Sequence, residues 1–149
     1  MTGVVAQAFL AESVAVAGGR LFVHGAGWAN LRVASLPALP GRVGAAVLLQ
    51  VPTERAGEPI PLVLRLEGPD GAPLGLIAAP DADMLVAAEV EGTLVSEPAP
   101  QDSPLPYQLV PIAFNLDGLR LESAGVHTLV VEVDGAPAAT VPFAVVVDA

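Results

Sequence analysis

The chain contains no cysteine and no lysine, and only six of its 149 residues are aromatic. Without cysteine there are no disulfides, no zinc–thiolate or iron–sulfur ligands and no thiol nucleophile. A cysteine-free composition also fits a reducing compartment, and we expect a cytoplasmic protein. Six aromatic residues are too few for a surface that stacks nucleic-acid bases or sugars.

Positive charge is scarce as well. All six basic residues are arginines, and 16 acidic residues bring the formal net charge to −10. Such a chain repels phosphate backbones and anionic lipid surfaces, so we expect no nucleic acid and no membrane among its partners. Charged residues make up 15% of the chain and apolar residues 53%, whereas about 25% charged residues is typical of soluble domains.

Long apolar runs are also missing. No uninterrupted stretch reaches the roughly 18 apolar residues that a membrane-spanning helix needs. A small-x-small triplet stands at Ala15–Ala17, but no basic residue precedes it, and Gln7 and Glu12 interrupt the apolar stretch. A secretory signal peptide has a basic start and an unbroken apolar centre, so we predict none. The length predicts a single domain over residues 1–149.

Alternation of apolar and other residues with a period of two recurs along the chain, which is the pattern of half-buried β-strands. The residues expected on the core side are Val43, Ala45, Val47, Leu49, Val51, Leu62, Leu64, Leu66, Ala88, Val90, Leu94, Val110, Ile112, Phe114, Leu116, His127, Leu129, Val131, Val133, Val141, Phe143, Val145 and Val147. We therefore predict an all-β fold, an antiparallel β-sandwich of the immunoglobulin-like kind with about 8–10 short strands.

Glycine and proline separate these runs. Gly18–Gly19, Pro69–Gly71 and Asp134–Gly135 each stand between two runs and predict hairpin turns. Pro111 and Pro142 lie inside apparent strands, which predicts a sheet edge, a bulge or a late strand start at those positions.

Two segments carry other signals. Ser96–Pro106 is polar, acidic and rich in proline, and it predicts a long surface loop. Residues 4–17 fit both a first strand and a helical stripe, and we favour the strand because an alternating segment leads into Gly18–Gly19. The stripe consists of Ala6, Phe9, Leu10, Ser13 and Ala17.

The segment Leu119–Val133 resembles the turn and strand F of immunoglobulin-like domains. The matching residues are Leu121, Glu122, Ala124, Gly125 and His127. The resemblance implies that His127 takes the place of the corner tyrosine and Leu129 that of the usual cysteine. The chain departs from the pattern by having neither the tyrosine nor a disulfide partner there.

The whole chain is also similar to a family of uncharacterised bacterial proteins with a domain of unknown function. The similarity rests on Gly18–Leu31, with a glycine turn, a strand and Gly-x-Gly-Trp, and on Val110–Gly135. It implies a cytoplasmic β-sandwich and supplies no activity, cofactor or catalytic residue.

Few residues suggest chemistry. The two histidines, His24 and His127, form no paired metal-binding motif, and we expect His127 to be a buried structural group that bonds a backbone carbonyl. Gly25, Gly27 and Trp28 faintly suggest a dinucleotide loop, but the third glycine of that fingerprint is missing. We therefore assign a structural role to these three residues, with Gly25 and Gly27 in a bulge or tight bend and Trp28 packed over it. Gly125, in the turn before His127, is also expected to be structural.

Carboxylates offer one further candidate. Asp81 and Asp83 form an Asp-x-Asp in a turn region and are the candidate calcium ligands. Two aspartates are also a common turn composition, so we expect no metal and no cofactor. Glu89 and Glu91 share a strand face that we take to be solvated. No Gly-x-Ser-x-Gly nucleophile motif is present, and we predict no catalytic residue.

The function expected from these observations is contact with other proteins, without enzymatic activity, as a homo-oligomer or an accessory subunit. Several apolar residues point away from the predicted core, and something must cover them: Leu48, Val63, Val95, Val126 and Val130. Residues 4–17 folded back as a helix would be another cover. The alternative functions are a binding module for a small apolar ligand or calcium and, third, an enzyme whose site the sequence does not show.

Overall fold

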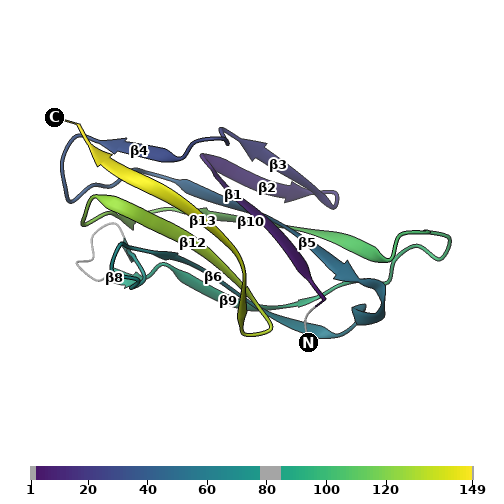
Figure 1. Ribbon diagram of the computed structural model, residues 1–149. Helices are drawn as coiled ribbons and strands as arrows, with labels where there is room; N and C mark the ends of the chain where they lie inside the picture. The colour runs from purple at the N-terminus through teal and green to yellow at the C-terminus, as the bar shows by residue number, and fades with distance from the viewer. Residues whose placement is uncertain (1–2, 78–84, 149) are drawn as a thin grey trace.

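Strands make up nearly all of the regular structure in the computed structural model, which describes residues 3–77 and 85–148 (Figure 1). Within these ranges there is no α-helix, and one short 3-10 turn, η1, spans Thr53–Arg55. The strands are β1 (Val5–Ala11), β2 (Ser13–Ala17), β3 (Arg20–His24), β4 (Asn30–Val33), β5 (Val43–Pro52), β6 (Pro59–Glu67), β7 (Gly75–Ile77), β8 (Leu85–Ala87), β9 (Glu89–Val95), β10 (Tyr107–Leu116), β11 (Leu119–Arg120), β12 (Gly125–Val133) and β13 (Ala136–Val147). These are more strands than predicted, since several have two to five residues.

Two larger sheets carry the architecture. The β5 sheet has the order β1-β5-β10, and the β12 sheet has the order β4-β13-β12-β6-β9. Neighbouring strands run antiparallel, except that β4 pairs with β13 in parallel. Two small antiparallel sheets, β2-β3 and β11-β7-β8, flank them. In Figure 1, β13 and β12 cross in front of β5 and β10.

The core lies between the two larger sheets. Val47 and Leu49 of β5 belong to the same buried cluster as Leu129 and Val131 of β12, which confirms the alternation read from the sequence. The predicted core side of β10 is less enclosed, because Val110, Ile112 and Phe114 are only half-buried. The prediction for Val147 was wrong: it is exposed at the end of β13.

The three predicted turns are present, although the third closes only a short hairpin. Gly18–Gly19 joins β2 to β3, and Asp134–Gly135 joins β12 to β13. At Pro69–Gly71 the hairpin is short, with a single antiparallel bridge between Glu67 and Pro73 and a hydrogen bond from the Gly68 amide to the Ala72 carbonyl at 2.9 Å. The chain turns there, and the Leu74 amide donates to the Leu66 carbonyl at 2.8 Å, but β7 then pairs with β8 and β11. Because β12 and β9 occupy both edges of β6, β7 has no free edge of β6 to pair with.

The prolines and the long loop agree with the sequence. Pro111 lies in β10, which forms an edge of the β5 sheet, and Pro142 lies in β13 beyond the residues that pair with β4. Neither position needs an amide hydrogen for a second neighbour. The segment Ser96–Pro106 contains no strand. Its first residue is buried, and the Ser96 carbonyl accepts a hydrogen bond from the Gly57 amide at 3.0 Å.

The amino-terminal residues form strands, as favoured from the sequence. No helix folds over a sheet within residues 3–77. Instead, the β2–β3 hairpin packs against β10 and β5. A second, small cluster of buried residues forms there from Ala11, Val14 and Ala46.

The five apolar residues predicted to point outward have three different outcomes. Val95 and Val126 are exposed, with Val126 at 60%. Leu48 and Val63 are half-buried. The prediction for Val130 was wrong, because only 5% of it is exposed. Its cross-strand neighbours are Arg65 and Thr140, so a long side chain on the same face can cover it.

Candidate interaction surfaces

The outer face of the β5 sheet, opposite the buried side of β5, carries no charged residue. We call it the uncharged face. By strand register it consists of Val5, Gln7, Phe9, Ala11, Gly44, Ala46, Leu48, Gln50, Pro52, Tyr107, Leu109, Pro111, Ala113 and Asn115. Charged residues are depleted and aromatic residues enriched at the centres of protein interfaces, so this face has the composition of a contact surface.

The β2–β3 hairpin covers one half of the uncharged face. Ala11 and Ala46 are fully buried beneath it, and Phe9, Leu21 and Ala113 pack around them. Gly44 allows the close approach, because a Cβ atom there would lie 3.3 Å from the backbone of Ser13. Small residues in both layers therefore set how near the hairpin lies.

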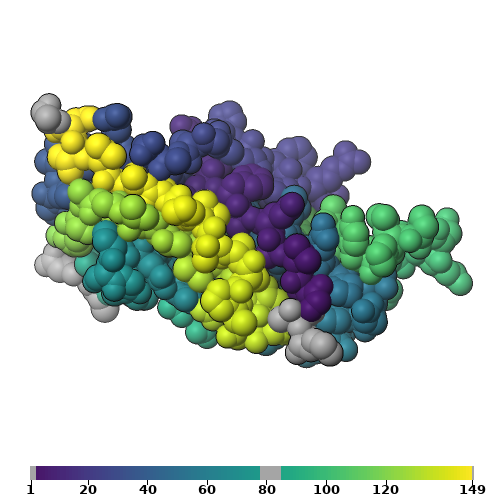
Figure 2. All heavy atoms as spheres, viewed as in Figure 1, coloured from purple at the N-terminus to yellow at the C-terminus, as the bar shows by residue number. Residues whose placement is uncertain are grey.

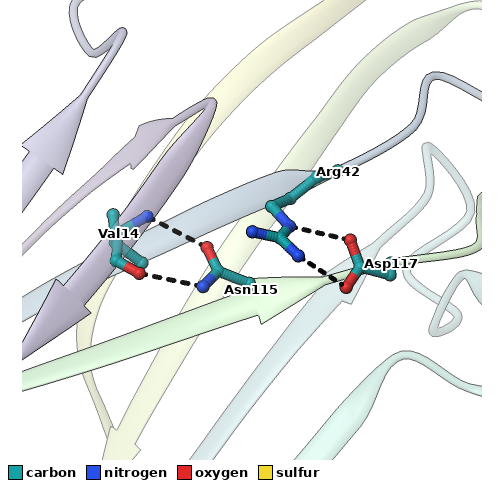
Figure 3. Close-up of polar contacts among 4 residues, drawn as sticks. All are labelled: Val14, Arg42, Asn115 and Asp117. Carbon is teal, nitrogen blue, oxygen red and sulfur yellow. Dashed lines mark hydrogen bonds and ion pairs between the residues drawn. The ribbon is translucent and has the colours of Figure 1, made fainter.

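Asn115 fastens this hairpin to the sheet (Figure 3). Its Oδ1 accepts a hydrogen bond from the Val14 amide at 3.0 Å, and its Nδ2 donates to the Val14 carbonyl at 2.8 Å. Two residues along the chain, Asp117 accepts from Arg42 Nε at 2.8 Å and Nη2 at 3.2 Å. These hydrogen bonds hold the pKa of the Asp117 carboxyl below its usual value. Asn115 was not among the functional residues predicted from the sequence, where its one signal is a polar side chain in an otherwise apolar strand.

The other half of the uncharged face has no cover within the described residues. Val5 is 54% exposed and Leu109 is 53% exposed, while Leu48, Pro111 and Tyr107 are half-buried. These five residues come from all three strands of the β5 sheet. Contiguous exposed apolar surface of this kind marks contact sites more often than a scattered single residue does.

The opposite side of the molecule is different. Figure 2 shows it facing the viewer, with the atoms of β12 and β13 in lime to yellow. Arg65 donates to Glu67 at 2.6 Å and also bonds Glu132 on this face. Both hydrogen bonds raise the pKa of the guanidinium. The outer face of the β12 sheet is therefore charged at its centre.

A shallow apolar groove lies between the two sheets along β9 and β10. It has a volume of about 230 Å³, and Val90, Leu94, Ile112 and Phe114 are half-buried along it. Pro111 interrupts the free edge of β10, and Glu89 and Glu91 are exposed on β9. Proline and charge at an edge oppose the addition of another strand. A smaller space beside it, lined by Ala45, Leu64 and Leu129 among others, measures only about 10 Å³, room for about one water molecule.

A wider groove, which we call the Trp28 groove, has a volume of about 500 Å³. It is lined by Ala11, Glu12, Trp28, Asn30, Leu31, Pro40, Arg42 and Val43. The predicted bend is present, since Gly25 and Gly27 have φ angles of +70° and +94° between β3 and β4. The Trp28 ring meets Phe143 edge to face at 6.0 Å and packs against the main core. A purely structural role for Gly25, Gly27 and Trp28 stays a prediction.

His127 is fully buried at the start of β12, and its Nδ1 lies 3.0 Å from the Gly125 carbonyl. A carbonyl only accepts, so Nδ1 carries the proton. The predicted burial and backbone bond are confirmed. The ring also lies 5.4 Å from that of Phe143, and Nε2 has no hydrogen-bond partner in the described ranges.

The structure does not test the candidate metal ligands. Asp81 and Asp83 lie outside the described residues. Among residues 3–77 and 85–148, no three acidic or histidine side chains are close enough to hold a metal ion. His24 is exposed. No helix in the same two ranges is long and apolar enough to cross a membrane.

The fold thus defines an all-β protein with two larger sheets and candidate contact surfaces. Residues 6–146 match the sequence profile of the "Family of unknown function (DUF6941)", and the chain belongs to this family. No curated protein matches it by sequence. One similar solved structure is a Pseudomonas fluorescens alkylpurine DNA glycosylase AlkC bound to DNA with an abasic site analog, at 11% identity and a TM-score of 0.46. The match covers 97% of this chain and 31% of the glycosylase chain.

Proposed function

We propose that this protein acts through protein–protein contacts and that two copies associate through the uncharged face. The observation that carries the proposal is the absence of charge across the outer residues of β1, β5 and β10. The open half of this face, around Val5 and Leu109, supplies exposed apolar surface. Removal of such surface from water favours association by about 25 cal/mol per Å² before the loss of translational freedom is counted.

Charge favours the uncharged face over the rest of the surface for contact between two copies. Each chain carries a formal net charge of −10, so two copies repel one another over most orientations. When two copies meet through the uncharged face, no carboxylate on that face of one copy lies against a carboxylate on the same face of the other. The outer face of the β12 sheet, with Glu67 and Glu132 beside Arg65, would bring like charges together.

The expected assembly is a symmetric dimer, because a two-fold axis lets the same patch serve both copies. The β2–β3 hairpin already covers Ala46 and Ala113, so only the remaining part of the face is available. We therefore expect an interface at the small end of the range, below about 1,200 Å² in total, and a concentration-dependent equilibrium between monomer and dimer.

We further propose that the two sheets form a sandwich of the immunoglobulin type. The order β1-β5-β10 corresponds to strands A, B and E of that fold, and β13-β12-β6-β9 corresponds to G, F, C and C′. His127 supports this assignment because it is buried two residues before Leu129 and bonds local backbone, as the corner tyrosine does. A cytoplasmic location stays a prediction from composition.

Sizing of two charge variants by light scattering tests the dimer. Leu109→Glu places a carboxylate on the open half of the uncharged face and should abolish association. Val126→Glu makes the same change at a residue of similar exposure on the other sheet and should leave it unchanged. Equal behaviour of the two variants, or a wild-type mass of one chain at every concentration, would refute the proposal.

A further inference from the structure

The Trp28 groove combines a carboxylate, a guanidinium and an amide with apolar walls. Mixed lining of this kind is typical of ligand sites, in which apolar surface supplies affinity and a few polar groups fix orientation. We infer that this groove binds a small organic cation, an alkyl-substituted ammonium or guanidinium group, with Glu12 as the counter-ion. Binding in the Trp28 groove does not require the proposed dimer.

The charge balance of the groove favours a cation. Arg42 directs Nε and Nη2 to Asp117 at 2.8 and 3.2 Å, so a neighbouring carboxylate already compensates its charge. Glu12 forms no ion pair and accepts no side-chain hydrogen bond within the described part of the chain. One uncompensated negative charge therefore faces the groove. The net charge of −10 adds a field that concentrates cations around the protein.

Gly25 positions this carboxylate. A Cβ atom at Gly25 would lie 2.7 Å from Glu12 Cγ and 2.9 Å from Oε2. The Glu12 side chain therefore lies directly on the bare backbone of the bend. The Glu12 amide holds the same bend, because it donates to the His24 carbonyl at 3.0 Å and to the Gly25 carbonyl at 3.2 Å. The φ of +70° also favours glycine at this position.

The apolar walls fit the alkyl part of such a ligand. Trp28, Leu31 and Pro40 line the groove beside Glu12. An indole is the aromatic group that attracts ammonium and guanidinium cations most strongly. The edge-to-face contact with Phe143 at 6.0 Å gives this ring a fixed place. Asn30 adds an amide that can accept a hydrogen bond from the cation.

Trp28 is the only tryptophan of the chain, so its fluorescence reports on this groove alone. The full chain is titrated with n-butylammonium chloride and, separately, with 1-butanol at matched ionic strength. We expect a saturable fluorescence change with the ammonium salt and at least tenfold weaker binding of the alcohol. No saturable change, or equal binding of the alcohol, would overturn the inference.

A charge-removing variant gives the second test. Glu12→Gln keeps the shape of the side chain and should weaken butylammonium binding about ten- to a hundredfold, the range expected when a charge-assisted hydrogen bond is lost. Glu97→Gln makes the same change in net charge at an exposed residue of the Ser96–Pro106 loop and should leave binding unchanged. Equal affinities of the two variants would refute the role of Glu12. Thermal melts of both confirm that the fold is intact.

A lysine side chain of another protein presents the same chemistry as a free amine. A third titration with Nα-acetyl-lysine methylamide separates the two sources. Tighter binding of this peptide mimic than of butylammonium assigns the groove to a lysine side chain, and weaker binding assigns it to a free amine. Gly25→Ala should reduce binding of either ligand, because the added methyl displaces Glu12. Unchanged affinity in this variant would contradict the positioning argument.

Discussion

Replacement of Asn115 by alanine should loosen the β2–β3 hairpin from the sheet. The variant removes both hydrogen bonds between the Asn115 side chain and the backbone of Val14. Val14 is buried, so its amide and carbonyl lose their partner without gaining full access to water. Each ordinary hydrogen bond contributes about 1 kcal/mol net, and a buried group left unpaired costs about 1–3 kcal/mol. We expect the free energy of unfolding to fall by about 2–4 kcal/mol.

If the hairpin detaches locally, the free energy of global unfolding falls by less. The assay must therefore separate local detachment of the hairpin from global unfolding. If the hairpin detaches as a unit, the amides of β2 and β3 exchange with solvent faster while those of β12 stay protected. Denaturant unfolding followed by hydrogen exchange measures both quantities. Asn30→Ala is the matched control, because Asn30 is exposed and has no side-chain hydrogen bond among residues 3–77 and 85–148. Equal stability and equal exchange in the two variants would refute the role of Asn115.

Three further predictions concern the fold. Both His127→Ala and His127→Phe remove the hydrogen bond to the Gly125 carbonyl, which contributes about 1 kcal/mol. His127→Ala also loses packing and should cost about 2–4 kcal/mol in total, whereas His127→Phe keeps the volume beside Phe143, removes the unpaired Nε2 and should cost about 1 kcal/mol. Similar losses in both variants, measured by urea unfolding, would contradict this. Asp134→Asn tests the ion pair between Asp134 and Arg55. The hydrogen bond that Arg55 donates lowers the pKa of the Asp134 carboxyl. Because the folded pKa is depressed, the pair stabilises the fold at neutral pH, and its contribution disappears as pH falls from about 4 toward 2. Asparagine tolerates the φ of +55° at this position, so melts of the variant and the wild type should differ at pH 7 and converge in acid; a difference independent of pH would refute the pairing. Thermal melts with and without a chelator should coincide, and a large drop on chelation would point to Asp81 and Asp83.

The sequence predicted the parts of the fold that depend on local pattern. Alternation identified the buried side of β5 and β12, and the turn residues Gly18–Gly19 and Asp134–Gly135 located two hairpins. The resemblance of Leu119–Val133 to the turn and strand F of immunoglobulin-like domains predicted a corner position for His127, and the predicted burial of His127 is confirmed. These features depend on residues close together in the chain.

The features that the sequence did not predict share a different cause. Val130 is covered on a face that was expected to be open, because Arg65, from a strand 65 residues away, lies opposite it. The turn at Pro69–Gly71 leads to another sheet because both edges of β6 are already occupied. Asn115 contacts Val14 across a separation of 101 residues. Local alternation carries no information on which distant strand approaches a given face.

The most direct test of the proposed dimer uses the absence of cysteine from the chain. A single spin label at Gln50→Cys lies on the uncharged face, and one at Thr140→Cys lies on the outer face of the β12 sheet. Pulsed dipolar spectroscopy then measures the distance between labels on different copies. Association through the uncharged face predicts a short, concentration-dependent distance for the first label and a long one for the second. A short distance at Thr140→Cys with none at Gln50→Cys would place the contact on the other sheet, and no dipolar signal from either would show that the chain does not pair.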